Sequence, residues 1–526
     1  MSKLILPYEE NKEKIIEAID LIANPIKQTI SPRGSNVAFS NGEEVYATND
    51  GVTIAKQINV EDELQNAVIK LIKQASLQTN TQAGDGTSTT VLLGSVFAKE
   101  GLRLVDKGYS RREIVNAYND FENKIIKALE SQKKEIKTDK DLEFIATISA
   151  NNDSNIAKDT VKIVKALGEY GQLVMDRSYS GDTEIIEDAG FILQGGMLGP
   201  VFSNIQGASL ADYQDVNIFI TDKNLYHQRE AEKILTVCEV NDIENIVIIA
   251  KDFTGDALKM FQLNHEKHNF NILLIKDPSD QSDKSLLDDL AIYIGAKKFS
   301  DATGTIETLT KDYFAIAKRV ISDPTKTTIV RKNKVNINLT QRISKLQAEL
   351  DKIKNKDSGE YKRIEKRISI LTNGIVTIKA GGRTTTEVKE RLYRYEDAVN
   401  ATRVAKKNGY LVGGGLSIFN AFRQIEKNIE EMEYRNVFDQ VCTANIRQIA
   451  INSDRNPNEV IKKIKESKNI NFGYNSLTDS FGDLLKQGVV DPYDVTIFSI
   501  KNAISIANII ISTRNYIVEK NEDNKD

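Results

Sequence analysis

The chain has 526 residues, which at roughly 100–200 residues per domain predicts about three domains. Hydrophobic residues make up 40% and charged residues 28%, which excludes a long disordered chain, a collagen-like fibre and a disulfide-stabilised scaffold. The 71 Lys and Arg against 75 Asp and Glu give a net charge of −4, so no general positive field could hold a nucleic-acid backbone. Two cysteines, far apart in the sequence, favour a reduced, cytoplasmic compartment.

The sequence contains no pattern typical of a targeting signal or a membrane span. Charged residues follow directly after residues 1–7, without an apolar segment or a cleavage site. No stretch approaches about 18 uncharged apolar residues, and the most apolar segment, near the C-terminus, is interrupted by Ser505, Asn508 and Ser512. We therefore expect no contact with a membrane.

The first part of the chain is predicted to be mainly helical. Isoleucine recurs every three or four residues between Ile15 and Ile26, which predicts a helix. Turn residues flank two short segments, 36–39 and 45–47, which could form a hairpin. A long helix is expected over about 61–78.

The middle of the chain changes to an alternation of strands and helices. Short β-branched runs occur at 216–220, 246–250 and 272–275, and helical stretches near 229–240 and 255–268 separate them. This order predicts a small α/β domain with a mostly parallel sheet. No Gly-rich dinucleotide fingerprint follows any of these strands, so we expect no cofactor site there.

Helical segments follow the α/β region. Two apolar stripes within 340–371, separated by a turn, predict a helical hairpin. Its Lys and Glu are interpreted as a solvated face, with a nucleic-acid arm as the less favoured alternative. After about residue 409 the chain is again helical, with an apolar face over 495–514.

The strongest local signal is a loop of glycine, aspartate and hydroxyl residues at 84–90, directly before an apolar helix over 91–105. Glycines let the backbone approach a ligand closely, and a helix N-terminus favours phosphate. An acidic residue in such a loop would repel phosphate unless it held a cation, so Asp85 is a candidate Mg²⁺ ligand. A turn followed by a good N-cap explains the loop equally well. The loop lacks Gly-Lys-Ser/Thr, which excludes the usual P-loop mechanism.

Other candidate residues are weaker when taken one at a time. A glycine run at 413–415 precedes an apolar helix and could admit a nucleotide, although close helix packing is the favoured explanation. Asp50 and Asp397, each taken alone, are most simply interpreted as a helix cap or a surface charge. The three histidines fit no metal-ligand spacing, and no Ser/His/Asp or Cys/His constellation is present.

Taken together, these motifs resemble the group I (bacterial-type) chaperonins, the ring-forming machines of protein folding. The resemblance runs nearly end to end, and its order and spacing make chance agreement very improbable. The motifs, in chain order, are SPRGSN at 31–36, NDGV at 49–52, GDGTST at 84–89, ISAN at 148–151, EDA at 396–398, ATR at 401–403, GGG at 413–415, GYN at 473–475 and DP at 491–492. The motifs near 148, 401 and 473 favour the bacterial over the archaeal and eukaryotic group.

The resemblance implies a multidomain α+β chaperonin fold with two discontinuous domains. A mostly helical equatorial ATPase domain would comprise 1–132 and 409–526. A small intermediate domain would comprise 133–189 and 375–408, and an α/β apical domain 190–374. Gly190 and Gly374 fall where the family bends between the last two domains.

The resemblance also implies a site for ATP with Mg²⁺ and K⁺. Asp85 would bind Mg²⁺, and Asp397, on the mobile intermediate domain, would orient the attacking water with help from Asp50. The K⁺ positions match Thr29, Asn49 and Ser88, where Asn49 replaces the family's lysine at a backbone contact. The other nucleotide positions are Thr29, Ile30, Ser31 and Pro32 beside the nucleotide, with Pro32 against the base, Gly86, Thr87, Ser88 and Thr89 at the phosphates, Gly414 by its backbone, Asn475, Ser476 and Leu477 at the adenine, and Asp491 at the ribose.

The family binds non-native polypeptides, and its co-chaperonin, through an apolar strip on the apical domain. The matching positions in this chain are Met197, Leu198, Val201, Phe202, Leu235, Leu258 and Leu263. Each could equally be an ordinary core residue. Glu232 and Gln262 stand where the family usually has aliphatic residues, which predicts a more polar groove.

The implied assembly is a heptameric ring, single or double, with non-native proteins and a possible co-chaperonin as partners and no nucleic acid. Asp106, Lys107, Arg455, Asn456 and Glu459 depart from the family's ring–ring contact, so we expect weak stacking of rings or a single ring. The leading hypothesis is an ATP-driven folding chaperone. The alternative is a ring-forming scaffold or holdase that has lost productive folding, and the retained carboxylates argue against it.

Overall fold

The structure, a computed structural model, describes residues 3–41, 44–168, 171–178, 181–205, 209–277, 285–332, 337–353, 355, 358–372 and 374–519. Its contacts divide the chain into two compact units. Unit 1 consists of Met1–Val164 with Gly382–Asp526, and unit 2 is the inserted segment Lys165–Gly381. The two ends of the chain therefore build one unit together.

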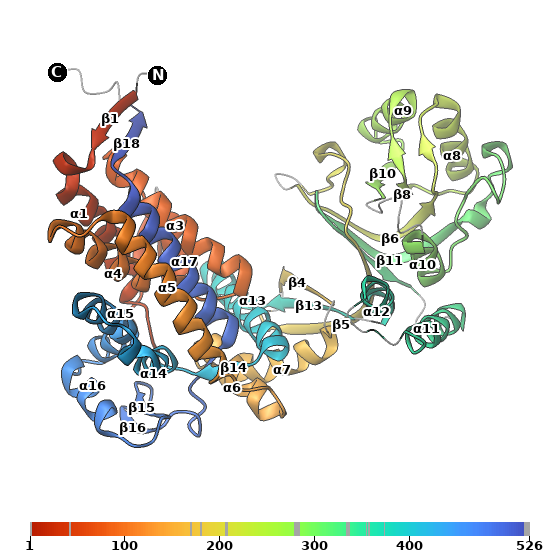
Figure 1. Cartoon of the computed structure of the whole chain (residues 1–526). Coiled ribbons are helices and arrows are strands. Elements are labelled where there is room, and N and C mark those ends of the chain that lie inside the picture. Colours follow the sequence, from red (N-terminus) through yellow and green to blue (C-terminus); the bar gives the residue numbers. More distant parts are fainter. Residues whose placement is uncertain are drawn as a thin grey trace. The chain divides into compact units, whose positions relative to one another are not determined.

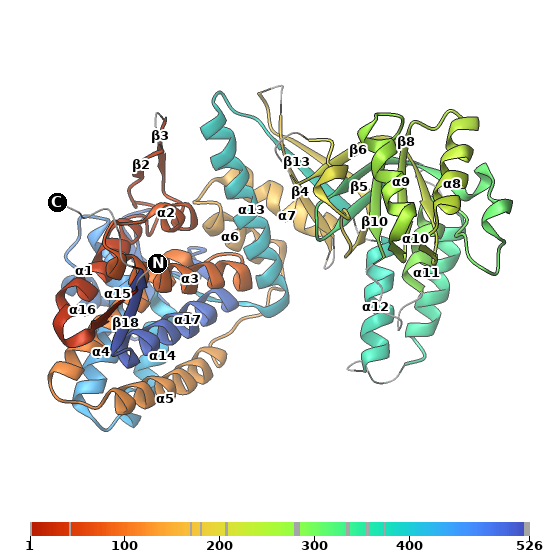
Figure 2. The same cartoon turned by 90° about the horizontal axis from the view of Figure 1, so that it is seen from above.

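Unit 1 is mainly helical (Figures 1 and 2). Its helices are α1 (Tyr8–Lys27), α2 (Gly51–Gln57), α3 (Glu63–Ala83), α4 (Thr87–Asp106), α5 (Arg111–Glu130), α6 (Asp139–Ser149), α7 (Ser154–Leu167, which crosses the boundary between the units), α13 (Thr385–Asn408), α14 (Leu416–Ile425), α15 (Met432–Ile451), α16 (Pro457–Glu466) and α17 (Tyr493–Ser512). The predicted helices over 15–26 and 61–78 are confirmed as parts of α1 and α3, each longer than its apolar pattern indicated.

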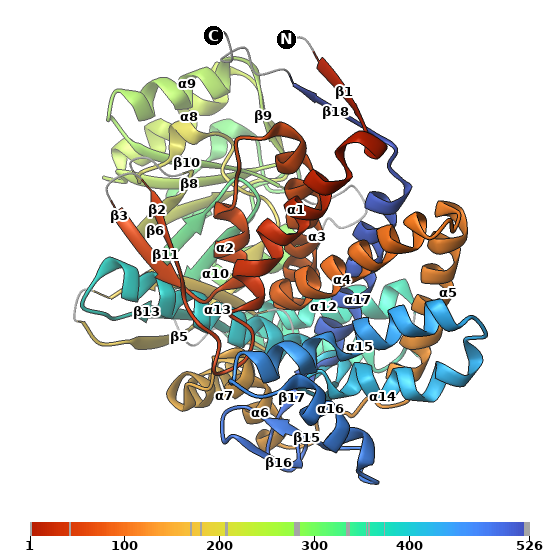
Figure 3. The ribbon, with the colours of Figure 1, turned by 90° about the vertical axis from the view of Figure 1, so that its left-hand side faces the viewer.

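Short antiparallel strand pairs complete unit 1, and two of them join segments far apart in the sequence. The pairs are β1 (Lys3–Pro7) with β18 (Asn515–Glu519), β2 (Val37–Asn41) with β3 (Glu44–Thr48), β14 (Tyr410–Val412) with β17 (Val490–Pro492), and β15 (Phe472–Asn475) with β16 (Ser480–Asp483). The second pair confirms the predicted hairpin. Figure 3 shows β1 and β18 side by side, in agreement with their register from Lys3–Glu519 to Pro7–Asn515.

The core of unit 1 lies between α1, α3, α4, α5, α15 and α17. Its centre is aromatic, and the rings of Phe121 and Phe438 stack with their centroids 3.9 Å apart. Among the described residues α17 alone is long and apolar enough to span a membrane, but it packs against α3, α4 and α5 and more than half of its most apolar window is buried. We therefore interpret α17 as a core helix.

Unit 2 is built around one eight-stranded sheet with the order β10-β8-β6-β11-β12-β5-β13-β4. Its strands are β4 (Gln172–Arg177), β5 (Glu184–Leu193), β6 (Ala211–Ile220), β8 (Asn245–Ala250), β10 (Asn271–Lys276), β11 (Phe314–Ser322), β12 (Thr327–Arg331) and β13 (Gly374–Ala380), with a small parallel pair, β7 (Asn224–Leu225) and β9 (Asp252–Phe253). The helices are α8 (Gln228–Val240), α9 (Gly255–Glu266), α10 (Ser285–Ile294), α11 (Ile337–Leu350) and α12 (Gly359–Thr372).

The expectation of a mostly parallel sheet is wrong. Only β10–β8, β8–β6 and β13–β4 are parallel pairs, and the other four neighbouring pairs are antiparallel. The sequence prediction rested on the three strands linked by helices, which are indeed parallel. It missed β11 and β12, which are joined by a tight turn and must therefore run antiparallel.

The segments expected to form the intermediate and the apical domain contribute strands to this one sheet, since β4 and β13 pair within it. Gly190 lies inside β5 and pairs with Val330. A Cβ on Gly190 would overlap the side chain of Ile375, so close packing against β13 requires glycine there. The three-domain boundaries and the hinge at Gly190 and Gly374 stay predictions.

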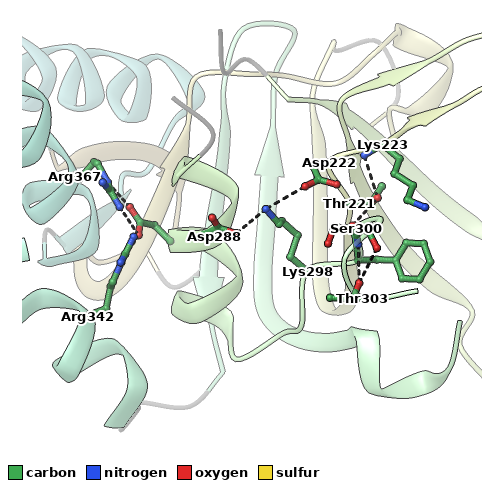
Figure 4. Close-up of polar contacts among 11 residues, drawn as sticks. Thr221, Asp222, Lys223, Asp288, Lys298, Ser300, Thr303, Arg342 and Arg367 are labelled. Atoms are coloured by element: carbon green, nitrogen blue, oxygen red, sulfur yellow. Dashed lines mark hydrogen bonds and ion pairs between the residues drawn. The ribbon is translucent and has the colours of Figure 1, made fainter. Parts of the chain in front are cut away.

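Ion pairs hold α10 from two sides in unit 2 (Figure 4). The buried carboxylate of Asp289 accepts hydrogen bonds from Nε of Arg342 on α11, at 2.8 Å, and from Nε of Arg367 on α12, at 2.7 Å. The neighbouring Asp288 points to the opposite side and pairs with Lys298 at 2.7 Å. The contacts of Asp289 attach helices α11 and α12 to α10. The two helices confirm the predicted helical hairpin.

Candidate functional site

The loop between α3 and α4 is shaped by two glycines in the left-handed region. Gly84 ends α3 with φ +76°, and Gly86 begins α4 with φ +100°. Asp85 lies between them and accepts a hydrogen bond from the Gly86 N–H at 2.5 Å. Because Gly86 has no side chain, α4 starts without a side-chain cap. Its first-turn N–H groups therefore suit an anionic ligand.

A second helix N-terminus meets the first at this loop. Asp50 caps α2, where its carboxylate accepts from the N–H groups of Val52, at 3.2 Å, and Thr53, at 2.7 Å. A Cβ on Gly51 would overlap Oγ of Ser88, so the first residue of α2 lies directly against the first turn of α4. The fold thereby brings the predicted residues Asp50, Asp85 and Ser88 together.

Helix α13 brings Asp397 to the same place. A Cβ on Gly84 would lie only 2.7 Å from Cβ of Asn400, one turn along α13 from Asp397. The hydroxyl of Tyr395 donates to the carboxylate of Asp159 on α7 at 3.0 Å and so anchors α13. A cleft of about 260 Å³ opens between these elements. It is lined by Asp50, Val52, Thr53, Lys56, Gln57, Asn80, Tyr393, Glu396, Asp397 and Asn400.

The carboxylates of the site perturb one another. Burial raises the pKa of Asp85, and the negative charge of Asp50 adds to this rise against the hydrogen bond from Gly86. Burial, followed by the charges of Asp85 and Asp50, raises the pKa of Asp397 well above its ordinary value. Burial and the charge of Asp85 raise the pKa of Asp491 to about 7. This concentration of negative charge favours binding of a cation.

The residues present fit a cation held together with a phosphorylated ligand. In the described part of the chain, no group of three or more His, Cys, Asp or Glu could hold a metal ion by itself. A Mg²⁺ ion bound here would need oxygen ligands from a second molecule, and phosphate oxygens are typical. The buried Oγ1 of Thr87 and Oδ1 of Asn80 have no hydrogen-bond partner among the described residues.

The residues predicted to lie beside the nucleotide and its base, 29–32 and 475–477, form two turns in unit 1, which we call the base-side turns. In the first turn, Thr29 is buried and donates its hydroxyl to the carbonyl of Ile26 at 2.8 Å, Ser31 has a positive φ of 82°, and Pro32 is exposed. In the second turn, Oδ1 of Asn475 accepts from the N–H of Leu477 at 3.0 Å.

The remaining predicted residues of the nucleotide site also lie in unit 1. Ile30 and Asn49 are half-buried, and Asn49 directly precedes Asp50. Ser476 is buried and Leu477 exposed. Gly414 has a positive φ of 66°, and Asp491 pairs with Leu411 in the short β14–β17 ladder.

The predicted apolar strip of unit 2 is only partly exposed. Met197, Phe202 and Leu235 lie in the core. Leu198, Val201 and Leu258 are half-buried against that core, and Leu263 is 46% exposed. Sequence patterns could not separate these cases, because an apolar residue in a partly buried segment gives the same pattern in either role.

Charges at the expected ring–ring contact have partners within the chain. Asp106 pairs with Lys12, and Lys107 pairs with Glu433 at 2.9 Å. Arg447 donates to the side chain of Asn458 at 2.8 Å. Such intrachain pairs reduce the charge available to a neighbouring ring, and the expectation of weak stacking stays a prediction.

Residues 22–521 match the TCP-1/cpn60 chaperonin family. The chain belongs to this family. Two curated relatives are chaperonin 60 subunit alpha 2, chloroplastic, of Arabidopsis thaliana, and chaperonin GroEL of Methanospirillum hungatei JF-1. The first is 30% identical over 99% of this chain and 91% of the relative, and the second is 31% identical over 99% and 98%. The resemblance to group I chaperonins is thereby confirmed.

Solved structures with the same fold include the chaperonin gp146 from the bacteriophage EL 2 (Pseudomonas aeruginosa) in the presence of ATP-BeFx. Its crystal form II gives a TM-score of 0.74 at 21% identity and covers 98% of this chain and 99% of that chain, and crystal form I gives 0.68. The multidomain α+β chaperonin fold is therefore confirmed. Since one curated relative of this chaperonin is chloroplastic, family membership alone does not fix a compartment.

Sequence reasoning missed several residues of the site in this chaperonin. Asn80, Lys56, Tyr393 and Asn400 line the cleft but belong to none of the motifs that carried the resemblance. Asn400 stands one turn along α13 from Asp397, so helical spacing from that carboxylate could have indicated it. Asn80 is on α3, whereas Asp85 lies in the loop after that helix, so helical spacing gives no signal for Asn80.

Proposed function

We propose that this chaperonin binds non-native proteins and promotes their folding in a ring, driven by hydrolysis of Mg-ATP in unit 1. The observation that carries the proposal is the convergence of Asp50, Asp85 and Asp397 on the uncapped N-terminus of α4. Buried carboxylates that repel one another have no structural benefit without a cation. A scaffold or holdase without ATP turnover would not need them.

In this proposal each carboxylate has a separate role. Asp85 holds Mg²⁺, which would neutralise charge on the phosphates when bound. The N–H groups and hydroxyls of Thr87, Ser88 and Thr89 bind phosphate oxygens. Asp397 orients the attacking water, and Asp50 supports that water from the N-terminus of α2. Thr29, Asn49 and Ser88 are the proposed K⁺ positions.

Contacts to the base and the ribose complete the proposed nucleotide site. Ile30, Ser31 and Pro32 lie on one side of the nucleotide, and Asn475, Ser476 and Leu477 flank the adenine. Gly414 approaches by its backbone, and Asp491 accepts from the ribose hydroxyls. Either form of the Asp491 carboxyl has an acceptor oxygen for a ribose hydroxyl, and a cation bound beside it would lower its raised pKa of about 7.

Client binding is proposed for unit 2, the segment that includes the expected apical domain. Leu263 is its most exposed candidate, and the half-buried Leu198, Val201 and Leu258 extend the apolar surface. Apolar surface that faces a cavity recognises unfolded chains without regard to sequence. The buried Met197, Phe202 and Leu235 would contribute only through rearrangement.

Replacement of Asp397 tests the catalytic part of the proposal. The variant Asp397→Asn keeps the shape of the side chain, so ATP binding should stay within about twofold while the rate of phosphate release falls by about 100-fold or more. Glu396→Gln is the matched control, since Glu396 lines the same cleft one residue earlier. Turnover that responds equally to both changes would contradict the role of Asp397.

A refolding assay tests the proposal as a whole. The parent protein should rescue an aggregation-prone client in the presence of ATP and Mg²⁺, and Asp397→Asn should not. Adding a bacterial co-chaperonin in a parallel reaction shows whether folding requires it. ATP turnover without rescue in either reaction would favour the scaffold or holdase.

A further inference from the structure

The turn that follows α15 contacts the first of the two base-side turns. Asn452, at the end of α15, donates its side-chain amide to the backbone carbonyls of Lys27, at 3.0 Å, and Ile30, at 2.8 Å. Its own Oδ1 accepts from Gln448 at 2.8 Å, which fixes the orientation of the amide. The carbonyls that it binds flank Thr29, so Asn452 fixes the backbone of the proposed nucleotide wall over 29–32.

Three residues later the same turn contacts the second base-side turn. Nε of Arg455 donates to Oδ1 of Asp479 at 2.9 Å, and Nη2 donates to Oδ2, so the guanidinium holds the carboxylate with two parallel bonds. Tyr474 donates its hydroxyl to the same Oδ1 at 2.7 Å. Asp479 itself has a positive φ of 51°, a left-handed geometry that aspartate adopts more readily than most residues and that the three bonds maintain.

The two walls also interact electrostatically through Asp479. The hydrogen bonds from Arg455 and Tyr474 lower the pKa of Asp479, and the positive charge of Arg33 contributes further. Arg33 directly follows the first base-side segment, 29–32, and Asp479 lies two residues after the second, 475–477. Asn452 and Arg455 therefore connect two segments that lie more than 400 residues apart in the chain.

We infer that Asn452 and Arg455 are positioning residues that set the spacing between the two base-side walls, and so determine the affinity for the nucleoside part of the ligand. Neither residue is placed at the phosphates or at the carboxylates of the cleft. The inference rests on the proposed nucleotide site. It predicts an effect on nucleotide affinity that is separable from the chemical step, because the carboxylates around α4 stay in place.

A merely structural role is distinguishable from this inference. The side chain of Arg455 is 53% exposed and that of Asp479 27% exposed, and ion pairs this accessible contribute little to folding stability. Loss of the pair should therefore leave the melting temperature nearly unchanged. Its effect should appear in the Michaelis constant for ATP.

The test compares the parent protein with Asp479→Asn and Asn452→Ser in the full chain. Each variant should raise KM for ATP by about 3–5-fold, equivalent to the upper range for one exposed charged pair, and leave kcat within about twofold. Inhibition by tripolyphosphate, which has no base or ribose, should be unchanged. Asp252→Asn in unit 2 is the matched control, because Asp252 is an accessible carboxylate paired to Lys276 at 2.9 Å.

The outcomes separate this inference from the proposed function. Failure of the parent protein to bind ATP would overturn the proposed function. A parent that binds ATP, with variants that show unchanged KM or weaker inhibition by tripolyphosphate, would overturn the positioning role alone. Arg455→Lys keeps the charge without the two parallel bonds and should give an intermediate KM.

Discussion

At the scale of single residues, the buried carboxylates of this chaperonin have two kinds of surroundings. Asp289 is enclosed by the guanidinium groups of Arg342 and Arg367, so its charge is neutralised within the fold. Asp85 and Asp397 have no salt bridge to Lys or Arg among the described residues and are surrounded by other acids. The first arrangement stabilises the fold. In the proposed function, the second arrangement is unfavourable by itself and a bound cation would neutralise it.

The difference makes Asp289 a test of structural charge pairing. Asp289→Asn leaves two guanidinium groups around a neutral side chain and should lower the stability of unit 2 by about 3–5 kcal/mol. Asp288→Asn is the control on the preceding residue, since the side chain of Asp288 is 48% exposed and its one salt bridge within the described part of the chain is to Lys298, so the loss should be at most about 1 kcal/mol.

Hydrogen exchange of α11 and α12, measured together with thermal unfolding, reports this stability locally. Faster exchange of both helices is expected in Asp289→Asn and not in Asp288→Asn. Equal effects of the two substitutions would contradict the structural role assigned to Asp289.

At the scale of elements, the site depends on how closely α13 approaches the loop between α3 and α4. Gly84 has a positive φ, and a Cβ there would also meet Cβ of Asn400 at 2.7 Å. Gly108, in the turn after α4, has a similar φ of 94°, but a Cβ there would have no neighbour within 4 Å. Substitutions at these two glycines therefore distinguish the effect of backbone strain, which both would cause, from a collision with α13, which only a side chain at Gly84 would cause.

Gly84→Ala and Gly108→Ala should both destabilise the protein by about 1–2 kcal/mol, the cost of left-handed geometry in an L-residue. Only Gly84→Ala should displace α13 and Asp397, with a fall in ATP hydrolysis of about 10–100-fold. The measurement is steady-state phosphate release beside chemical unfolding. A similar loss of hydrolysis in Gly108→Ala would show that general destabilisation, and not the position of α13, limits turnover.

Elements with local signals were predictable from the sequence, and their partners were not. The periodicity of α1 and α3 and the turn residues around β2 and β3 are local, so the corresponding predictions are confirmed. The pairing of β1 with β18 joins the two ends of the chain and leaves no local pattern. The mixed sheet was missed for the same reason, because strand direction depends on connections that local alternation does not encode.

The candidate site was predictable to the same extent. The residues proposed to bind Mg²⁺ and phosphate are consecutive in the loop around Asp85, so a local motif could indicate them. The contacts of Asn452 and Arg455 could not, because their partners lie far away and the bonds depend on the end of α15. Exposure was the hardest property to foresee, as the buried Met197 and Phe202 show.

At the scale of the whole molecule, the chain is divided into two units with separate cores. The core of unit 1 draws on both ends of the chain, whereas that of unit 2 draws only on the inserted segment. The proposed nucleotide residues all lie in unit 1, and the proposed client surface lies in unit 2. A ligand that binds one unit therefore need not stabilise the other.

This separation predicts a one-sided effect of the nucleotide on stability. ATP with Mg²⁺ at about 100 times its Kd should stabilise unit 1 by about 2.7 kcal/mol, because only the folded unit binds it. Hydrogen exchange should slow in the core helices α3, α4 and α17 and stay unchanged in β6, β8 and β10 of unit 2. Removal of Mg²⁺ with a chelator is the control and should abolish the protection, since Asp85 then faces the phosphates without a cation. Equal protection of both units by ATP would mean that the two cores unfold as one, and protection without Mg²⁺ would contradict the role assigned to Asp85.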